Sequence, residues 1–381
     1  FTDVDDKIIK AANEAGISTK ELSDKFIAAF MEDTGQLGIK PATQNPRVIN
    51  YMDEIIAFVS TLVDKGFAYV SEGDVYFRVA KSNNYAKLAN KTLEDLEIGA
   101  SGRTDAETER KENPLDFALW KAAKEGEVSW DSPWGPGRPG WHIECSVMAT
   151  EILGDTIDIH GGGADLEFPH HTNEIAQSEA KTGKTFANYW MHNGFVNVDN
   201  EKMSKSLGNF VTVHDMLQTV DGQVLRFFLA TQQYRKPINF TEKAIHDAEV
   251  NLKYLKNTHS LPLTEQVNQA ELQTYLDAFQ EAMDDDFNTA NGVTVLFDMA
   301  KWINSGNYDQ TVKDAFEKML QVFGIVFEEE VLDEDIEKLI EERQAARANK
   351  DFATADRIRD ELAAQGIKLL DTKEGVRWTR D

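Results

Sequence analysis

The chain has 381 residues, of which 41% are hydrophobic, and its formal net charge is −26. The length predicts two or three domains, and the single cysteine excludes an intrachain disulfide and fits a reducing compartment. We find no apolar run near the roughly 20 residues that a membrane span needs. The large negative charge argues against a nucleic-acid-binding protein, because it repels a polyanion, unless a local basic patch overrides it.

The first 66 residues are expected to be mostly helical. Helices are predicted at residues 5–15, 19–31 and 46–66. Ser18 and Glu21 have the spacing of a capping box at the start of the second helix. Pro46 is placed in the first turn of the third helix and Gly66 at its end. Residues 67–79 alternate in hydrophobicity on both sides of a Glu-Gly-Asp turn and predict a β-hairpin.

Loops, two helices and a strand are expected between the hairpin and residue 183. Residues 81–114 are polar, and residues 132–140 (SPWGPGRPG) are too rich in glycine and proline for regular structure. Residues 141–153 predict a helix that carries the single cysteine. Residues 156–160 predict a buried strand that opens into a glycine-rich turn, and residues 169–183 predict a helix that begins at a proline and ends at a glycine.

The back half of the chain is expected to be helical. A short strand at residues 194–200 comes before it, and several amphipathic helices follow after residue 220. The last 51 residues read as a pair of charged helices and a short strand-like tail. This order predicts an α/β front half joined to a helical bundle.

Five of the eight histidines lie between residues 142 and 192, which first indicates a site there. His170 and Glu174 are four residues apart on a predicted helix, so their side chains project from one face. With Cys145 from a separate helix they form a Cys/His/Glu set, which favours zinc with an open fourth position. His171 is a competing ligand, but Ile175, four residues on, fits the apolar face of the helix.

Cys145 and the His–Glu pair also have a simpler interpretation. A lone cysteine in a helix is usually a small buried apolar group, and a His–Glu pair four residues apart is common on helix surfaces. The spacing alone leaves both interpretations open.

The string EKMSKSLGN, residues 201–209, predicts a phosphate-binding loop. Lys202 and Lys205 supply mobile cations, while Ser204, Ser206 and a glycine allow a phosphate to approach the backbone closely. The alternative is a solvated loop with two lysines.

A glycine-rich turn, His160 to Gly163, follows the predicted strand and would allow a ligand to approach the backbone. Asp165, just beyond, could hold an ammonium group or cap the next segment. Each of these signals is weak when taken alone.

Together the strings GWHIECS, HGGGADLEFPHHTNEIAQS and KMSKS resemble the cysteinyl-tRNA synthetases, a family of class I aminoacyl-tRNA synthetases. The resemblance covers the whole chain. It implies a Rossmann-like α/β catalytic domain, incomplete at its N-terminus, then an α-helical bundle and a small C-terminal anticodon-binding module. The expected boundaries are 1–220, with a connective insert at about 65–140, then 221–330 for a stem-contact and DALR-like bundle, and 331–381.

The resemblance also implies roles for particular residues. The zinc of the family is held by two cysteines, a histidine and a glutamate, and Cys145, His170 and Glu174 match three of these. Lys205 matches the ATP-contacting lysine, with Lys202 beside it, and both are expected to act in catalysis. Ser204 and Ser206 belong to the same ATP-binding loop. The residues that match the amino-acid pocket are Trp141, Asp165, Thr2 and, less closely, His160.

The expected activity is that of a cysteine–tRNA ligase. L-Cysteine reacts with ATP, supplied with Mg²⁺, to give cysteinyl-adenylate, and the cysteinyl group then passes to tRNA(Cys). One Zn²⁺ per chain would bind the substrate thiolate and so reject serine, a poorer ligand, without an editing domain. We expect a cytoplasmic monomer that does not bind membranes.

Two features of the resemblance bear on activity. The second zinc cysteine and the HIGH motif of the family have no counterpart here, so we expect a truncated chain that is inactive as given. One alternative is a non-catalytic synthetase-like chain that binds RNA or a protein. Another is a ligase that joins cysteine to a small amine on the same core, but it should lack the tRNA-reading tail.

The C-terminal segment is where a polyanion would be repelled least. From Glu341 to the end there are nine Lys and Arg and nine Asp and Glu residues. Arg343, Arg347 and Lys350 are predicted to share one helical stripe that could contact RNA. An ion-paired helical hairpin is the alternative.

Overall fold

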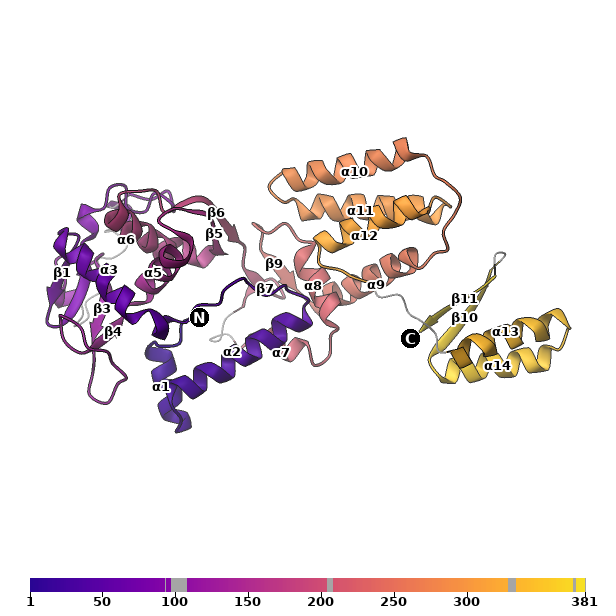
Figure 1. Ribbon diagram of the computed structural model, residues 1–381, viewed down its shortest axis with the longest axis horizontal. Helices are drawn as coiled ribbons and strands as arrows, with labels where there is room; N and C mark the ends of the chain where they lie inside the picture. The colour runs from indigo at the N-terminus through magenta and orange to yellow at the C-terminus, as the bar shows by residue number, and fades with distance from the viewer. Residues whose placement is uncertain (93, 97–107, 204–207, 328–333, 373–374, 381) are drawn as a thin grey trace. The chain divides into compact units, whose positions relative to one another are not determined.

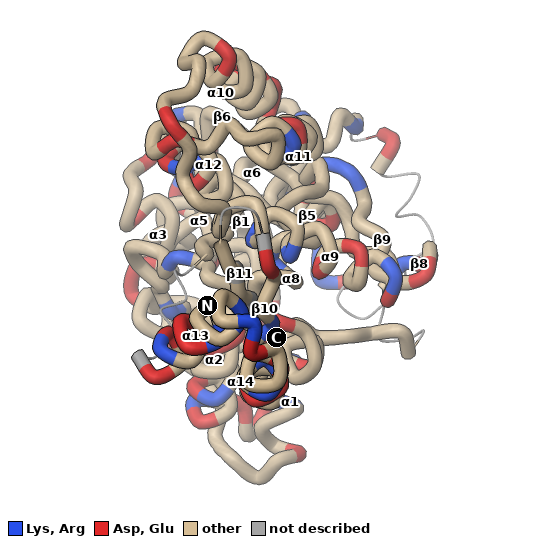
Figure 2. Tube along the Cα trace, turned by 90° about the vertical axis from the view of Figure 1, so that its right-hand side faces the viewer, with Lys and Arg blue, Asp and Glu red and all other residues tan. Residues whose placement is uncertain are grey.

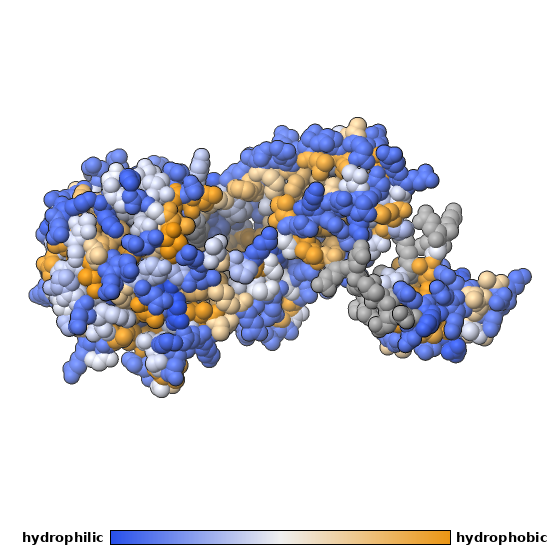
Figure 3. All heavy atoms as spheres, viewed as in Figure 1, coloured by the Kyte–Doolittle hydropathy of each residue, from blue (hydrophilic) through white to orange (hydrophobic). Residues whose placement is uncertain are grey.

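The computed structural model describes the whole chain except residues 93, 97–107, 204–207, 328–333, 373–374 and 381. The described residues form two compact units, 1–326 and 327–381, which Figure 1 shows as ribbons. Among the described residues, none of the helices combines the length and hydropathy that a membrane span requires. Figure 3 shows hydrophilic residues over most of the visible surface, with smaller apolar groups between them.

The N-terminal helices are α1 (Asp6–Ala15), α2 (Thr19–Gln36) and α3 (Met52–Asp64). The predicted capping box of α2 is confirmed, because Ser18 and Glu21 exchange both of its hydrogen bonds. The prediction that the third helix begins at Pro46 is wrong. Arg47 is extended and binds Asp3 through its side chain, so the helix starts only after a 3₁₀ turn at Val48–Tyr51.

A four-stranded antiparallel sheet follows, in the order β1-β2-β3-β4. Its strands are β1 (Ala68–Ser71), β2 (Asp74–Phe77), β3 (Phe117–Ala122) and β4 (Gly137–Pro139). The hairpin is confirmed, with Glu72 and Gly73 both at positive φ in its turn. Residues 132–140 were expected to lack regular structure, and β4 contradicts this. An edge strand tolerates Pro139, and a Cβ at Gly137 would lie 2.4 Å from the Lys121 carbonyl oxygen.

The main hydrophobic core lies between this sheet, α3 and α5 (Trp141–Leu153). Phe58, Trp120, Ile143 and Val147 are fully buried there. One face of α5 therefore packs into the core, which fixes the helix that carries Cys145.

Strands β5 (Ile157–Gly163) and β6 (Ala187–Asn193) pair in parallel and are connected through α6 (Thr172–Thr182). The helix was predicted at 169–183, and Gly183 ends it in the left-handed conformation as expected. The strand was predicted at 156–160 and buried, which is wrong in two respects. It runs through all three glycines, and Ile159 is 59% exposed because β5 pairs only with β6 among the described residues.

A second small sheet joins the front half to the bundle. It contains β7 (Val196–Val198), β8 (Glu201–Lys202) and β9 (Ile238–Phe240), with β7 antiparallel to β8 and parallel to β9. Helices α7 (Val213–Met216) and α8 (Gly222–Ala230) lie between β8 and β9 in the sequence.

Four helices form the bundle that was predicted after residue 220. They are α9 (Glu242–His259), α10 (Gln269–Asp284), α11 (Thr289–Asn304) and α12 (Gln310–Val322), drawn in salmon to orange in Figure 1. Leu255, Leu296 and Phe316 are fully buried between them. Arg226 of α8 donates to the carbonyl oxygens of Leu37 and Phe323, which terminate α2 and α12. This cation complements the negative ends of two helices.

The second unit is a helical hairpin with a two-stranded sheet, as the charged pair and tail predicted. Its elements are α13 (Glu334–Ala348), α14 (Phe352–Ala364), β10 (Ile367–Thr372) and β11 (Gly375–Arg380). Ile336, Ile358, Leu362 and Ile367 form its core. Figure 2 shows basic and acidic residues intermixed along α13 and α14.

The basic stripe predicted on α13 is present only in part, because Arg343 and Arg347 share a face but both pair with Asp371. Arg343 is buried and forms two hydrogen bonds of 2.9 Å with Asp371, and Arg347 also pairs with Asp371. Lys350 lies beyond the end of α13 at positive φ. Two of the three cations therefore stabilise the hairpin, as the alternative interpretation expected.

Candidate metal and nucleotide site

Helices α5 and α6 bring the predicted ligands together. A ligand atom from each of Cys145, His170 and Glu174 lies within 4.8 Å of the other two. Cys145 comes from α5, Glu174 from the first turn of α6, and His170 from the helical turn before it. The His–Glu pair is not on the surface, because His170 is 4% and Glu174 0% exposed.

Glu174 lies at the centre of this cluster, with its carboxylate completely buried. Its Oε2 is 2.8 Å from Nε2 of His160, and its Oε1 is 3.2 Å from Nε2 of His170. Oε1 has no hydrogen-bond partner among the described residues. Burial raises the pKa of Glu174, whereas the hydrogen bond from His160 opposes that shift. A buried carboxylate oxygen without a hydrogen bond is costly unless a cation or a proton compensates it.

A second set of three ligands shares Glu174. His160, His171 and Glu174 also have ligand atoms within 4.8 Å of one another. In this set Nδ1 of His171 lies 2.8 Å from Nε2 of His192, and Nε2 of His171 is 3.9 Å from the Glu174 carboxylate. The second set lacks sulfur, so the set with Cys145 fits a soft metal such as zinc better.

The buried histidines are held in the neutral form that metals bind. Burial, with repulsion from neighbouring imidazoles, lowers the pKa of His142 to about 3, of His170 to about 4 and of His171 to about 3. Burial and the carboxylates of Glu174 and Glu144 raise the pKa of Cys145. The cluster therefore carries a neutral thiol unless a cation is present, and a bound cation would favour the thiolate.

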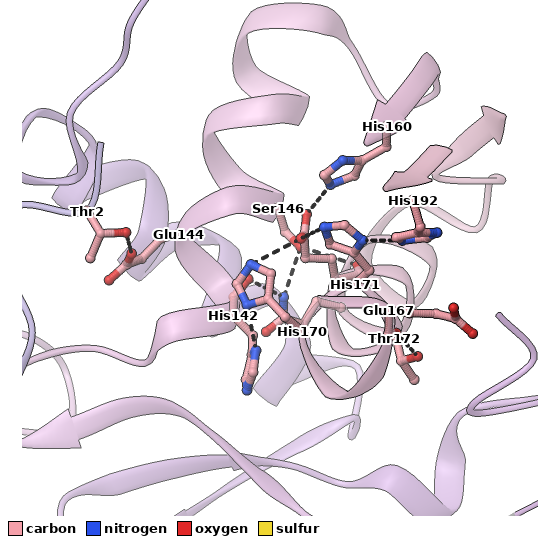
Figure 4. A network of polar contacts seen from close by, with 12 residues as sticks. Thr2, His142, Glu144, Ser146, His160, Glu167, His170, His171, Thr172 and His192 are labelled. Carbon is pink, nitrogen blue, oxygen red and sulfur yellow. Dashed lines mark hydrogen bonds and ion pairs between the residues drawn. The ribbon is translucent and has the colours of Figure 1, made fainter. Parts of the chain in front are cut away.

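His142 supports His170, and the sequence did not single it out. Nδ1 of His142 lies 3.0 Å from Nδ1 of His170 (Figure 4). This contact leaves Nε2 of His170 facing Glu174. Gln177 in turn donates to the His142 carbonyl oxygen. Partners on the far ring nitrogen fix the tautomer of a metal-binding histidine. The only signal in the sequence was that His142 belongs to the cluster of five histidines.

The glycines of the HGGG string leave room for protein side chains. A Cβ at Gly162 would lie 2.9 Å from Cε1 of His171, and one at Gly163 would lie 2.4 Å from Oδ1 of Asp165. We predicted that a ligand could approach this backbone closely, whereas the atoms beside these two glycines belong to protein side chains. Asp165 itself is exposed, in a 3₁₀ turn on the segment that joins His160 to His170.

Three of the four residues predicted for the amino-acid pocket, Trp141, Thr2 and His160, contact the cluster or its neighbour Glu144. Trp141 is 49% exposed, and its ring centroid lies 4.3 Å from that of His170. Thr2 donates from Oγ1 to Oε2 of Glu144 at 2.9 Å. Glu144 is 1% exposed, and burial raises its pKa to about 8. The sequence did not predict Glu144, because its partner lies 142 residues away.

The KMSKS string is only partly described. Ser204, Lys205 and Ser206 lie outside the described residues. Lys202 lies on strand β8, paired with Asn197 of β7, whereas we expected it in a flexible loop. Its Nζ is 4.4 Å from the centroid of the Phe195 ring.

The chain matches three protein families along its length. Residues 1–250 match the tRNA synthetases class I (C) catalytic domain, residues 278–328 the DALR domain, and residues 329–378 the cysteinyl-tRNA ligase anticodon binding domain. It is 95% identical to a cysteine–tRNA ligase of Streptococcus thermophilus and 81% identical to one of Streptococcus agalactiae. Each alignment covers all of this chain and 85% of the relative.

Solved structures show the same fold at low sequence identity. A Mycobacterium tuberculosis methionyl-tRNA synthetase in complex with methionyl-adenylate superposes with a TM-score of 0.58 at 16% identity. The superposition covers 83% of this chain and 78% of that protein. The predicted class I synthetase architecture, with helical and anticodon-binding domains after it, is confirmed.

Proposed function

The chain belongs to the cysteine–tRNA ligases, a family of class I aminoacyl-tRNA synthetases, and from this premise we propose which of its residues carry the reaction. The family activates L-cysteine with ATP and transfers it to tRNA(Cys). The match of residues 329–378 to an anticodon binding domain disfavours a cysteine:amine ligase, which has no tRNA to read. The relatives that match the whole chain are ligases by name, which disfavours a non-catalytic chain.

Cys145, His170 and Glu174 form the zinc site in this proposal. The observation that carries it is the buried Glu174 carboxylate, whose Oε1 has no hydrogen bond among the described residues and lies 3.2 Å from Nε2 of His170. A ligand atom of Cys145 lies within 4.8 Å of an oxygen of the same carboxylate. One thiol, one neutral imidazole and one carboxylate are ligands that zinc accepts, and they match three of the four zinc ligands of the family. Zinc, when bound, supplies a soft Lewis acid that prefers a thiolate to a hydroxyl. Cysteine is thereby selected over serine without a second, hydrolytic site.

The surrounding side chains orient the ligands and the substrate. His142 fixes His170, and His160 holds the second oxygen of Glu174. Thr2, Asp165 and Trp141 form the pocket for the rest of the amino acid. Because Thr2 directs its proton to Glu144, its lone pairs can accept a hydrogen bond from the substrate ammonium group.

Lys202 and Lys205 act on ATP, which binds with Mg²⁺. Their ammonium groups stabilise the charge that develops on the phosphates when the cysteine carboxylate attacks the α-phosphate. Ser204 and Ser206 contribute hydroxyl donors to the same phosphates. The reaction needs no nucleophilic side chain, because a substrate supplies the nucleophile in each step. The cysteine carboxylate attacks the α-phosphate and releases pyrophosphate, and a hydroxyl of the terminal adenosine of the tRNA then attacks the adenylate carbonyl and releases AMP.

The domain boundaries of this proposal are 1–220 for catalysis, 221–330 for the stem-contact and DALR-like bundle, and 331–381 for anticodon recognition. Matches to a DALR domain at 278–328 and to an anticodon binding domain from residue 329 support the last two. We assign the activity to a monomer in the cytoplasm, where tRNA is charged for translation.

The test is the metal content of the full-length protein and of single variants, measured by mass spectrometry. We expect about one zinc per chain, lost in Cys145→Ser and kept in His171→Gln. Loss in His171→Gln with retention in Cys145→Ser would assign the metal to the second set of ligands. Cysteine-dependent ATP–pyrophosphate exchange in a protein without zinc would show that Cys145 is a small buried apolar group. It would also refute the proposal that zinc selects cysteine over serine.

A further inference from the structure

The first lysine of the KMSKS string rests on an aromatic ring. Nζ of Lys202 lies 4.4 Å from the centroid of Phe195, within the roughly 6 Å of a cation–π interaction. Phe195 is 36% exposed and Lys202 is exposed. The ring therefore contacts the ammonium group from one side, while the remaining N–H donors are accessible to a ligand.

The geometry of the hairpin explains this contact. Strands β7 and β8 pair Asn197 with Lys202, through a tight turn in which Asp199 and Asn200 both have positive φ. Such turns match the twist of two antiparallel strands. Phe195 is two residues before Asn197, so its side chain lies on the same face and diagonally across from Lys202.

The backbone on both sides of Phe195 is fixed. Its carbonyl oxygen accepts a hydrogen bond of 2.8 Å from the N–H of Ile238, and the Gly194 N–H donates to the Tyr234 carbonyl oxygen at 2.7 Å. A Cβ at Gly194 would lie 2.4 Å from the carbonyl carbon of Lys236, so the two segments are in close contact. These hydrogen bonds and this close contact fix the backbone that carries the Phe195 ring.

We propose that Phe195 is a positioning residue that holds the Lys202 ammonium group ready for the phosphates of ATP. A free lysine side chain samples many rotamers, and this freedom is lost when it binds a phosphate. A lysine side chain that the ring already holds loses less conformational entropy when it binds a phosphate, so ATP binds more strongly. The inference rests on the proposed contact between Lys202 and ATP.

The test compares ATP–pyrophosphate exchange in the full-length, zinc-loaded enzyme and four variants. Phe195→Leu should raise the KM for ATP about two- to five-fold, the size of an exposed cation–π interaction, and leave the KM for cysteine unchanged. Phe195→Tyr retains an aromatic face and should restore the wild-type KM. In a Lys202→Met background, Phe195→Leu should have no further effect, because the ring acts only through the lysine.

Phe26→Leu is the matched control. Phe26 is 62% exposed on α2, and Nζ of Lys25 lies 5.9 Å from its ring centroid. Its replacement removes a similar lysine–phenylalanine contact outside the site, so the KM for ATP and the KM for cysteine should both stay unchanged.

The outcomes separate this inference from the proposed function. If Lys202→Met does not alter exchange, the role of Lys202 is wrong and the inference falls with it. If Lys202→Met weakens ATP use but Phe195→Leu does not, the inference alone is overturned. An equal effect of Phe195→Leu with and without Lys202 would show that the ring acts on the fold of the hairpin, which also overturns it.

Discussion

The pair formed by Arg343 and Asp371 gives a prediction about the stability of the second unit. Arg343 is only 7% exposed at its side chain, and both of its terminal nitrogens bind the Asp371 carboxylate at 2.9 Å. Asp371→Asn removes the carboxylate that is hydrogen-bonded to that buried guanidinium and leaves only the weaker, longer-range attraction of Asp356. Breaking a buried ion pair costs about 3–5 kcal/mol. The Asp371 side chain is 42% exposed, so solvent screening reduces the expected loss to ~1–2 kcal/mol.

The pKa of Asp371 supports the same magnitude. Its hydrogen bonds with Arg343 lower the pKa from 3.8 to about 2, with a smaller contribution from Arg347. A shift of that size corresponds to about 2.4 kcal/mol before screening is considered. Because the folded-state pKa is the lower one, the stabilisation is present above about pH 4 and is lost as the pH falls toward 2.

Hydrogen–deuterium exchange of the α13 peptide in the full-length protein measures this local stability. For Asp371→Asn we expect exchange about 5- to 30-fold faster at neutral pH, the equivalent of 1–2 kcal/mol. Asp360→Asn is the control, since its pair with Arg359 is 50–72% exposed and should be worth less than about 1 kcal/mol. Equal exchange in the two variants would refute the argument that burial of Arg343 determines the cost.

Three further predictions concern the first unit, residues 1–326. Gly222→Ala would place a Cβ 2.0 Å from the Gln36 carbonyl oxygen. It should therefore lower the free energy of unfolding, measured by urea titration, by about 1–3 kcal/mol. Gly35→Ala is the control, because its Cβ would meet no atom within 4 Å and should not destabilise the protein. Phe316→Ala removes a fully buried ring from the bundle and should lower the free energy of unfolding by about 3–5 kcal/mol in the same assay. Val322→Ala is its control, because Val322 is 54% exposed and its loss should change that free energy by at most about 0.5 kcal/mol. His142→Ala should weaken zinc binding about 10- to 100-fold in competition with a chromophoric chelator, and unchanged affinity would contradict its orienting role.

Local signals in the sequence predicted the elements that short-range chemistry determines. The capping box at Ser18 and Glu21, the hairpin turn at Glu72 and Gly73, and the amphipathic helices of the bundle were all foreseen, because each depends on residues a few positions apart. Strand β4 and the late start of α3 were not. Both depend on pairing with segments that are distant in the sequence.

The candidate site likewise contains residues that local spacing predicted and residues that only the fold brings together. The spacing of His170 and Glu174 was readable, because four residues separate positions on one helix face. The contacts of His142 with His170, of His160 with Glu174 and of Thr2 with Glu144 span between 14 and 142 residues. No periodicity in the sequence encodes such distances, so these orienting residues required the fold.

The ion pairs of the second unit also limit how it can bind a polyanion. Arg357 and Arg359 pair with carboxylates on their own helix and are half or more exposed. Exchanging such a partner for a phosphate costs little, because exposed pairs contribute about 0–1 kcal/mol. Arg343 cannot make this exchange without leaving Asp371 and the core. Exposed cations such as Arg357 are therefore better placed for phosphate contacts than Arg343, and the salt dependence of tRNA binding should fall in Arg357→Gln but not in a variant of Arg343 that still folds.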